Sequence, residues 1–126
     1  MDTRTKILTP EALAGFEPAR PLLLVSGRFD ILRVELAREL AGARQRTGAG
    51  SLLVVIRPLA DELAPIRARA ELAAALRMVD YVFIAENGDF AGLAGTLQPI
   101  ETISLEEAES QRTRQLIEHV HSRQSA

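Results

Sequence analysis

The sequence predicts an α/β fold, a three-layer Rossmann-like parallel sheet with helices on both faces. Strand-like and helix-like segments alternate, and the strand-like ones are nearly continuous apolar runs, as expected for strands covered on both faces. Glycine and proline residues separate these segments. The length of 126 residues fits one domain, so we expect residues 1–126 to form a single unit. Residues 1–21 would be its lead-in, with a short helix at about 10–15.

The first half of the chain contains the most strongly predicted elements. LLLVS at 22–26 is the first central strand, because it is a short apolar run between a proline and a glycine. Apolar residues then recur at helical spacing from 31 to about 46, which predicts an amphipathic helix. That helix stops near Gly48, which can adopt the left-handed conformation of a helix C-cap. SLLVVI at 51–56 is the second strand.

The second half repeats the alternation with weaker elements. Pro65 is suited to the first turn of a helix, where its missing N–H is not needed. Ser104 and Glu107 form a capping box for the final helix, and Glu106 is one of the acids that favour the start of that helix. We expect a helix at 65–78, a strand at 79–84, a turn at ENGD, a short helix at 90–97, a strand at 100–103 and a final helix at 105–122.

Composition excludes several kinds of function. The chain is 47% hydrophobic with a net charge of −2, which gives no electrostatic reason to expect a nucleic-acid partner. It has no cysteine, which excludes disulfides and thiol nucleophiles and favours a reducing, cytoplasmic location. Its apolar runs are too short to cross a membrane, and its first residues lack the apolar stretch of a signal peptide. His119 and His121 are two apart on a helix, so a shared metal site is not expected.

The loop at 26–33 is the strongest candidate for a ligand site. Gly27 lets the chain leave the first strand, and Asp30 can cap the following helix. In parallel sheets, ligands bind at the carboxyl ends of strands beside the point where the strand order reverses, and this loop follows the first central strand. Arg33, near the start of the helix, is a candidate for anion binding.

The segment SGRFDILRVELAREL resembles a motif of the cytidylyltransferase-like nucleotidyltransferases, most of all the ADP-heptose synthase type of adenylyltransferase domain. In those domains G-x-F-D-x-x-H-x-G-H follows the first strand, and Gly27, Phe29 and Asp30 are in register with it. KILTPEAL is similar to the lead-in of the heptose type, and PIRARAELAAALRMVDYV to its P-x-x-x-R helix and V-D-x-V strand. The similarity covers residues 6–84. It implies a Rossmann-like fold, a nucleotide ligand and a homodimer.

The chain departs from this motif where catalysis takes place. Arg33 and Leu36 replace the two histidines, and Glu35 replaces the glycine between them. The loop after the second strand, IRPLADELA, is short and lacks the phosphate-binding lysine of the family, and the late serine- and threonine-rich segment is reduced to ESQRTRQL. Nucleotidyl transfer depends on donors to phosphate oxygens, and each lost donor costs about 2.7–4 kcal/mol of transition-state stabilisation. We therefore expect impaired catalysis.

Three functions remain open on these grounds. The first is a non-catalytic module that binds a nucleotide or another phosphate, such as ATP or CTP with magnesium. The second is an active transferase that joins a nucleoside triphosphate to a sugar or polyol phosphate through Arg33, Arg57 and Arg69, and the third is a structural interaction module. The residues expected to contact a ligand are Ser26, Gly27, Arg28, Phe29, Asp30, Arg33, Arg57 and Arg69.

Several of these residues also have a purely structural interpretation. Leu36 lies on the apolar stripe of its helix and would pack in the core. Glu35 would be a solvated helix residue, able to form at most a weak pair with Arg38 three positions later. Asp30 would be only an N-cap. Arg69 would pair with an acid on a neighbouring helix and so fix the packing.

Overall fold

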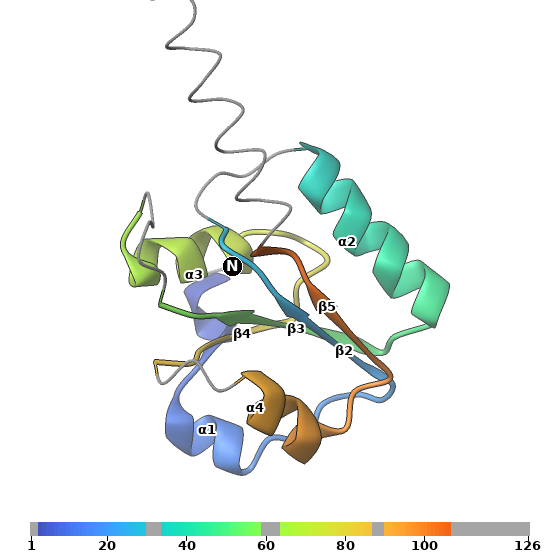
Figure 1. Cartoon of the computed structure of the whole chain (residues 1–126), viewed down its shortest axis with the longest axis horizontal. Coiled ribbons are helices and arrows are strands. Elements are labelled where there is room, and N and C mark those ends of the chain that lie inside the picture. The colour runs from blue at the N-terminus through green and yellow to red at the C-terminus, as the bar shows by residue number, and fades with distance from the viewer. Residues whose placement is uncertain (1–2, 30–33, 59–63, 87–89, 107–126) are drawn as a thin grey trace, which may run out of the picture.

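The computed structural model describes residues 3–29, 34–58, 64–86 and 90–106. They form a five-stranded parallel sheet in the order β1-β4-β3-β2-β5, with helices on both faces (Figure 1). The elements are η1 (a 3₁₀ helix, Thr3–Lys6), β1 (Ile7–Leu8), α1 (Pro10–Ala14), β2 (Leu22–Ser26), α2 (Val34–Thr47), β3 (Ser51–Ile56), α3 (Ile66–Ala74), β4 (Tyr81–Ile84), α4 (Phe90–Leu97) and β5 (Glu101–Ser104).

The strand order places the reversal of the sheet at β2. The chain runs from β2 through β3 to β4 in one direction and then returns to place β5 on the other side of β2. Because crossovers between parallel strands are right-handed, α2 and α3 cover one face and α4 covers the other, beside α1 (Figure 1). The predicted Rossmann-like α/β fold is confirmed.

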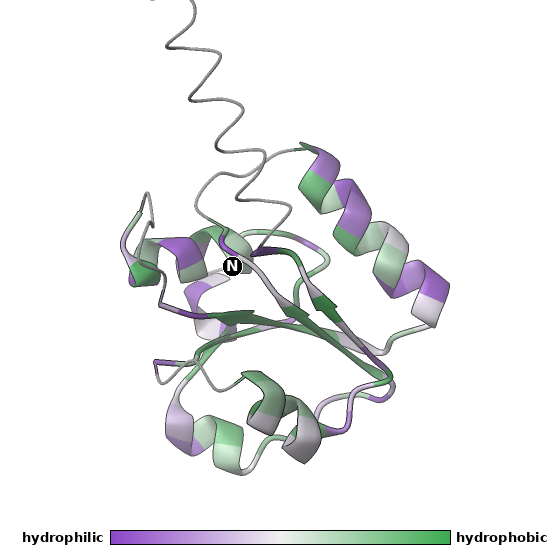
Figure 2. Ribbon diagram, viewed as in Figure 1, coloured by the Kyte–Doolittle hydropathy of each residue, from purple (hydrophilic) through white to green (hydrophobic). Residues whose placement is uncertain are grey.

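The central strands are buried on both faces, as their continuous apolar sequences predict. Every residue of β2 and β3 is buried, and these strands form a hydrophobic band through the middle of the molecule (Figure 2). Leu22 and Leu24 belong to the cluster on the α1 and α4 side, whereas Leu23 and Val25 belong to the cluster on the α2 and α3 side. This alternation follows from the two-residue period of a strand.

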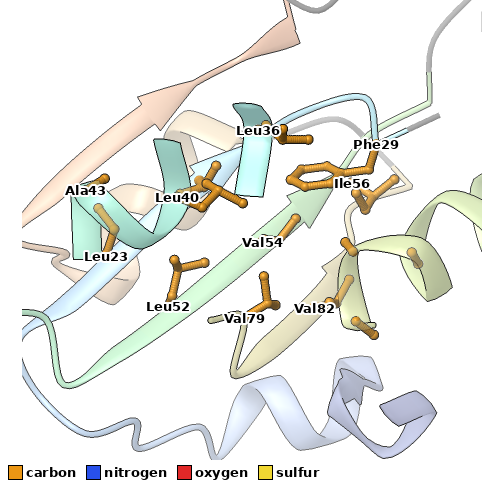
Figure 3. Packing of buried hydrophobic residues seen from close by; sticks show 14 residues of the cluster. Leu23, Phe29, Leu36, Leu40, Ala43, Leu52, Val54, Ile56, Val79 and Val82 are labelled. Carbon is orange, nitrogen blue, oxygen red and sulfur yellow. The ribbon is translucent and has the colours of Figure 1, made fainter. Parts of the chain in front are cut away.

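The helix α2 packs through the stripe that the sequence predicts. Leu36, Leu40 and Ala43 are buried against β2 and β3 (Figure 3). Its predicted first residues, 31–33, lie outside the described ranges. At its end Gly48 has a φ of 66°, and the amide of the next residue donates to the carbonyl of Arg44 at 3.1 Å. The predicted left-handed C-cap is therefore confirmed.

Helix α3 is shorter than predicted, and β4 begins later. The helix ends at Ala74 instead of 78, and the strand begins at Tyr81 instead of 79. Side chains from other elements bind the carbonyl groups of this connection. The only lysine of the chain, Lys6, donates to the carbonyls of Leu76 at 3.2 Å and Val79 at 2.7 Å. These contacts stabilise a turn where the apolar pattern predicted helix and strand.

Two further differences concern the ends of the chain. The lead-in contains a two-residue strand, β1, that pairs with β4 at the edge of the sheet and was not predicted. Ser104 is the last residue of β5, whereas it was predicted to cap the final helix. Glu107, its partner in the predicted capping box, and residues 108–122 of that helix lie outside the described ranges. Within the described ranges, no helix is long and apolar enough to cross a membrane.

Gly50 is required where two segments approach each other closely. A Cβ atom at Gly50 would lie 2.8 Å from the carbonyl oxygen of Arg20, and backbone cannot move aside easily.

We expect Gly50→Ala to destabilise the protein by roughly 1–3 kcal/mol through overpacking. Gly42 is the matched control, because it is exposed within α2 and a Cβ atom there would meet nothing within 4 Å. Gly42→Ala should stabilise by roughly 0.5–1 kcal/mol. Urea unfolding measures both, and equal effects would contradict this account.

The ion pair between Arg46 and Glu101 joins α2 to β5 and predicts a pH effect. Two guanidinium nitrogens donate to the carboxylate at 3.0 and 2.6 Å, and this hydrogen bonding from Arg46 lowers the pKa of Glu101. A lowered folded-state pKa gives stability that is present above the unfolded pKa and is lost as the pH falls through the folded pKa. Arg46→Ala should return the pKa of Glu101 toward its ordinary value. Carboxyl NMR titration checks this, and an unchanged pKa would refute the assignment.

Candidate functional site

The carboxyl ends of β2, β3 and β5 meet at the reversal of the sheet. Ser26 is the last residue of β2, Arg57 directly follows β3, and Glu106 lies two residues after β5. In open parallel sheets this is the place where ligands bind. The side chains of Ser26 and Arg57 both contact the carboxylate of Glu106 there.

The carboxylate of Glu106 is the centre of this cluster. Its Oε1 accepts hydrogen bonds from Nε of Arg57 at 3.1 Å and from Nη2 at 2.5 Å. Its Oε2 accepts a hydrogen bond from Oγ of Ser26 at 3.0 Å. The side chains of Arg57 and Glu106 are only 30% and 15% exposed, so water screens this pair less than a surface pair. We call the Ser26 hydroxyl and the Arg57 guanidinium the anion site.

The donors of the anion site are of the type that binds phosphate. A guanidinium presents its N–H groups in a fixed fork that matches the oxygens of either a carboxylate or a phosphate. A serine hydroxyl adds a neutral donor from a neighbouring strand. The carboxylate of Glu106 therefore occupies the position in which an oxygen pair of a phosphate group would find the same donors.

Phe90, the first residue of α4, lies beside the anion site. The Cζ atom of Arg57 is 5.6 Å from the centroid of its ring, which is within the range of a cation–π contact. The ring and the carboxylate of Glu106 together restrict the orientation of the guanidinium. The helix on the opposite face of the sheet from α2 thus contributes to the site.

Arg69 holds the two loops that carry the site. It lies in α3, and its side chain is fully buried. Its Nη1 donates to the carbonyl of Arg28 at 3.2 Å, and its Nη2 donates to the carbonyl of Arg57 at 2.9 Å. These carbonyls belong to the segments that follow β2 and β3. Both bonds are made to backbone oxygens, so Arg69 positions the chain on either side of the anion site.

The residues that directly follow β2 are buried. Phe29 has a φ of 52°, a left-handed conformation that is uncommon for a bulky residue, and its side chain is fully buried. Its ring lies toward Leu36 and Ile56 in the core (Figure 3). Gly27 is also buried, and Arg28 is only 2% exposed. Arg28 and Phe29, predicted as ligand contacts, are thus withdrawn from solvent in this structure. Asp30 and Arg33 lie outside the described residues.

Leu36 and Glu35, which differ from the motif that this segment resembles, face different ways. Leu36 is 2% exposed and packs in the core, as its structural interpretation predicts. Glu35 is exposed, as its interpretation as a solvated helix residue predicts. Neither residue supplies a donor to the carboxyl ends of the strands.

A separate cavity of about 950 Å³ lies between α1 and α4, beside the carboxyl ends of β1 and β4. Its walls are largely apolar and include Leu8, Leu13, Phe83 and Leu93. Phosphate recognition needs converging donors, and the described lining contains no pair of basic side chains. The anion site is therefore the better candidate for an anionic ligand, although it is no open hollow, because Glu106 fills it.

Sequence reasoning did not identify Glu106 as a site residue. It was interpreted as an acid that favours the start of a helix, and that interpretation takes no account of distant partners. Its position just after β5, the strand that pairs with the other side of β2, could have identified Glu106, because residues at such positions contribute to ligand sites. Among the described residues, no group of three histidine, aspartate or glutamate side chains could hold a metal ion.

Comparisons with known proteins support the fold. No family model and no curated protein matches the chain. Among solved structures, a lipopolysaccharide core biosynthesis protein from Thermoplasma volcanium GSS1 is similar, with a TM-score of 0.56 and 21% sequence identity. The match covers 76% of this chain and 87% of that protein. At this identity the likeness shows a shared fold, the open parallel α/β sheet described above.

Arg69 gives a test of how the site is held. Arg69→Met keeps the length of the side chain but leaves the carbonyls of Arg28 and Arg57 without these donors. We expect a loss of about 1–3 kcal/mol of unfolding free energy for each carbonyl left unsatisfied. Arg67→Met is the control, because Arg67 is exposed on the same helix and makes only a 3.5 Å contact with Glu71. It should cost about 0.3–0.5 kcal/mol. Similar losses in urea unfolding would contradict the role of Arg69.

Proposed function

We propose that this protein is a nucleotidyltransferase-like domain that binds a nucleotide or another phosphate-bearing ligand without transferring it, and so acts as a regulatory module. The observation that carries the proposal is the anion site. Arg57 and Ser26 direct three donors at one pair of anionic oxygens, at the reversal of the sheet. Such donors bind phosphate, and the reversal is where Rossmann-like folds bind nucleotides.

The fold comparison and the sequence resemblance support the same proposal independently. The similar structure is described as a protein of lipopolysaccharide core biosynthesis. The motif around Gly27, Phe29 and Asp30 resembles the adenylyltransferase domains of ADP-heptose synthase type, which bind ATP. The expected ligand is ATP or CTP with magnesium. The same resemblance is the ground for proposing a homodimer, which analytical ultracentrifugation checks directly.

The lack of transfer chemistry is proposed from the donors that remain. Transfer needs donors that stabilise charge on the phosphate oxygens in the transition state. Leu36 is in the core and supplies none, and Glu35 adds a negative charge to the same helical turn. The alternative, an active transferase that uses Arg33, Arg57 and Arg69, is weakened because Arg69 is buried and donates to backbone carbonyls. Arg33 and Arg57 alone would then have to supply the donors that the two histidines supply in the resembled motif.

Titration with ATP and CTP, each with and without magnesium, tests the proposal. We expect binding without release of pyrophosphate in the presence of sugar phosphates. Arg57→Ala should weaken binding roughly tenfold or more, because hydrogen bonds to a charged group are worth about 1.5–3 kcal/mol. Arg38→Ala, at an exposed position of α2, is the control and should leave the affinity unchanged.

Isothermal titration calorimetry and a pyrophosphate assay measure these quantities. Release of pyrophosphate that requires Arg33 would overturn the non-catalytic proposal in favour of an active transferase. No binding of either nucleotide would overturn nucleotide binding and favour a structural interaction module.

A further inference from the structure

We infer that Glu106 is a built-in competitor for the anion site, so that a phosphate group binds Arg57 and Ser26 only when the carboxylate of Glu106 leaves. This inference rests on the proposed function and concerns its regulation. The ligand-free chain would hold its own site closed with a side chain. Ligand binding would then change the structure at the end of β5.

The contacts of Glu106 leave little room for a second anion. Both of its oxygens are engaged, one by Nε and Nη2 of Arg57 and the other by Oγ of Ser26. The fork of the guanidinium is therefore already bound to a carboxylate. A phosphate placed on the same fork would meet that carboxylate at close range, and two like charges in a partly buried place repel each other strongly. Occupation by Glu106 and by phosphate is mutually exclusive.

The site of competition is connected to the backbone of the sheet. The amide of Leu105 donates to the carbonyl of Ser26 at 2.8 Å, which extends the pairing of β5 and β2 by one bond. The side chain of Leu105 packs against the core cluster beneath α2. Because Leu105 and Glu106 are adjacent, a ligand that displaces the carboxylate also weakens the attachment of this segment. The anion site and the end of β5 thus form one element with a closed and an open state.

The competition also defines the kind of ligand that can open the site. When only a fraction of the molecules has the site open, the apparent dissociation constant is the intrinsic one divided by that fraction. A singly charged carboxylate offers nothing more than Glu106 already provides. A doubly charged phosphate, or a chain of phosphates, interacts more strongly with the guanidinium. The built-in carboxylate therefore selects for phosphate monoesters and polyphosphates over carboxylates.

Glu106→Gln removes the competing charge with little change in shape and gives the test. We expect it to bind ATP and inorganic pyrophosphate roughly tenfold more tightly than the wild type, in line with the strength of a charged hydrogen bond. Glu17→Gln is the control, since Glu17 is exposed in the loop before β2 and the substitution removes the same charge. Its affinity should equal that of the wild type. Calorimetry measures all three proteins.

Hydrogen exchange at the amide of Leu105 provides a second readout. In the wild type we expect this amide to exchange faster when pyrophosphate is bound, because the segment is released from Ser26. In Glu106→Gln the amide should exchange faster even without ligand. Circular dichroism verifies that the variant is folded.

The outcomes separate this inference from the proposed function. If the wild type binds and Glu106→Gln binds no more tightly, the competition is refuted while the proposed function stands. If only Glu106→Gln binds, the competition is supported and binding by the wild type is refuted. If neither protein binds, there is no anion site, and the proposed function and the inference both fail. A gain in affinity shared by Glu17→Gln would also refute the competition, because it would reflect net charge alone.

Discussion

The two hydrogen bonds of Arg69 to backbone carbonyls are the constraint on which the arrangement of the site depends. Burying a guanidinium is costly unless its donors are satisfied, so the bonds to the carbonyls of Arg28 and Arg57 favour one position of each loop. The described part of the loop after β2 includes the buried Phe29, and the loop after β3 carries Arg57. An arginine in one helix therefore ties together the backbone of the two segments that follow β2 and β3.

The anion site places donors of the type that binds phosphate at the reversal of the sheet. Leu36, on the first part of α2, contributes to the core and not to the strand ends. The positive charge of Arg57 is balanced within the chain by the carboxylate of Glu106. The same carboxylate accepts a hydrogen bond from the Ser26 hydroxyl. A partly buried guanidinium without an anion would be unfavourable, so the internal carboxylate stabilises Arg57, and under the proposed function it would also oppose ligand binding.

Local sequence patterns predicted the central strands and helices of the structure. Contacts between residues distant in sequence explain where the structure differs from the prediction. The strands β2 and β3 agree with the predicted 22–26 and 51–56 because both are continuous apolar runs that must be buried. The burial of Leu36 follows from helical spacing in the same way. The strand β1 is too short to have a pattern, and the turn after α3 is bound by Lys6, which is distant in sequence. Glu106 and the backbone partners of Arg69 were missed because only the fold brings them to their donors and acceptors.

The position of a bound tetrahedral oxyanion tests the account most directly. Crystals of the protein grown with tungstate would show the anion through its anomalous scattering. The account predicts tungstate within hydrogen-bonding distance of the Arg57 guanidinium and the Ser26 hydroxyl, with the carboxylate of Glu106 moved away from both. Tungstate in the cavity between α1 and α4, with Glu106 still bound to Arg57, would contradict it.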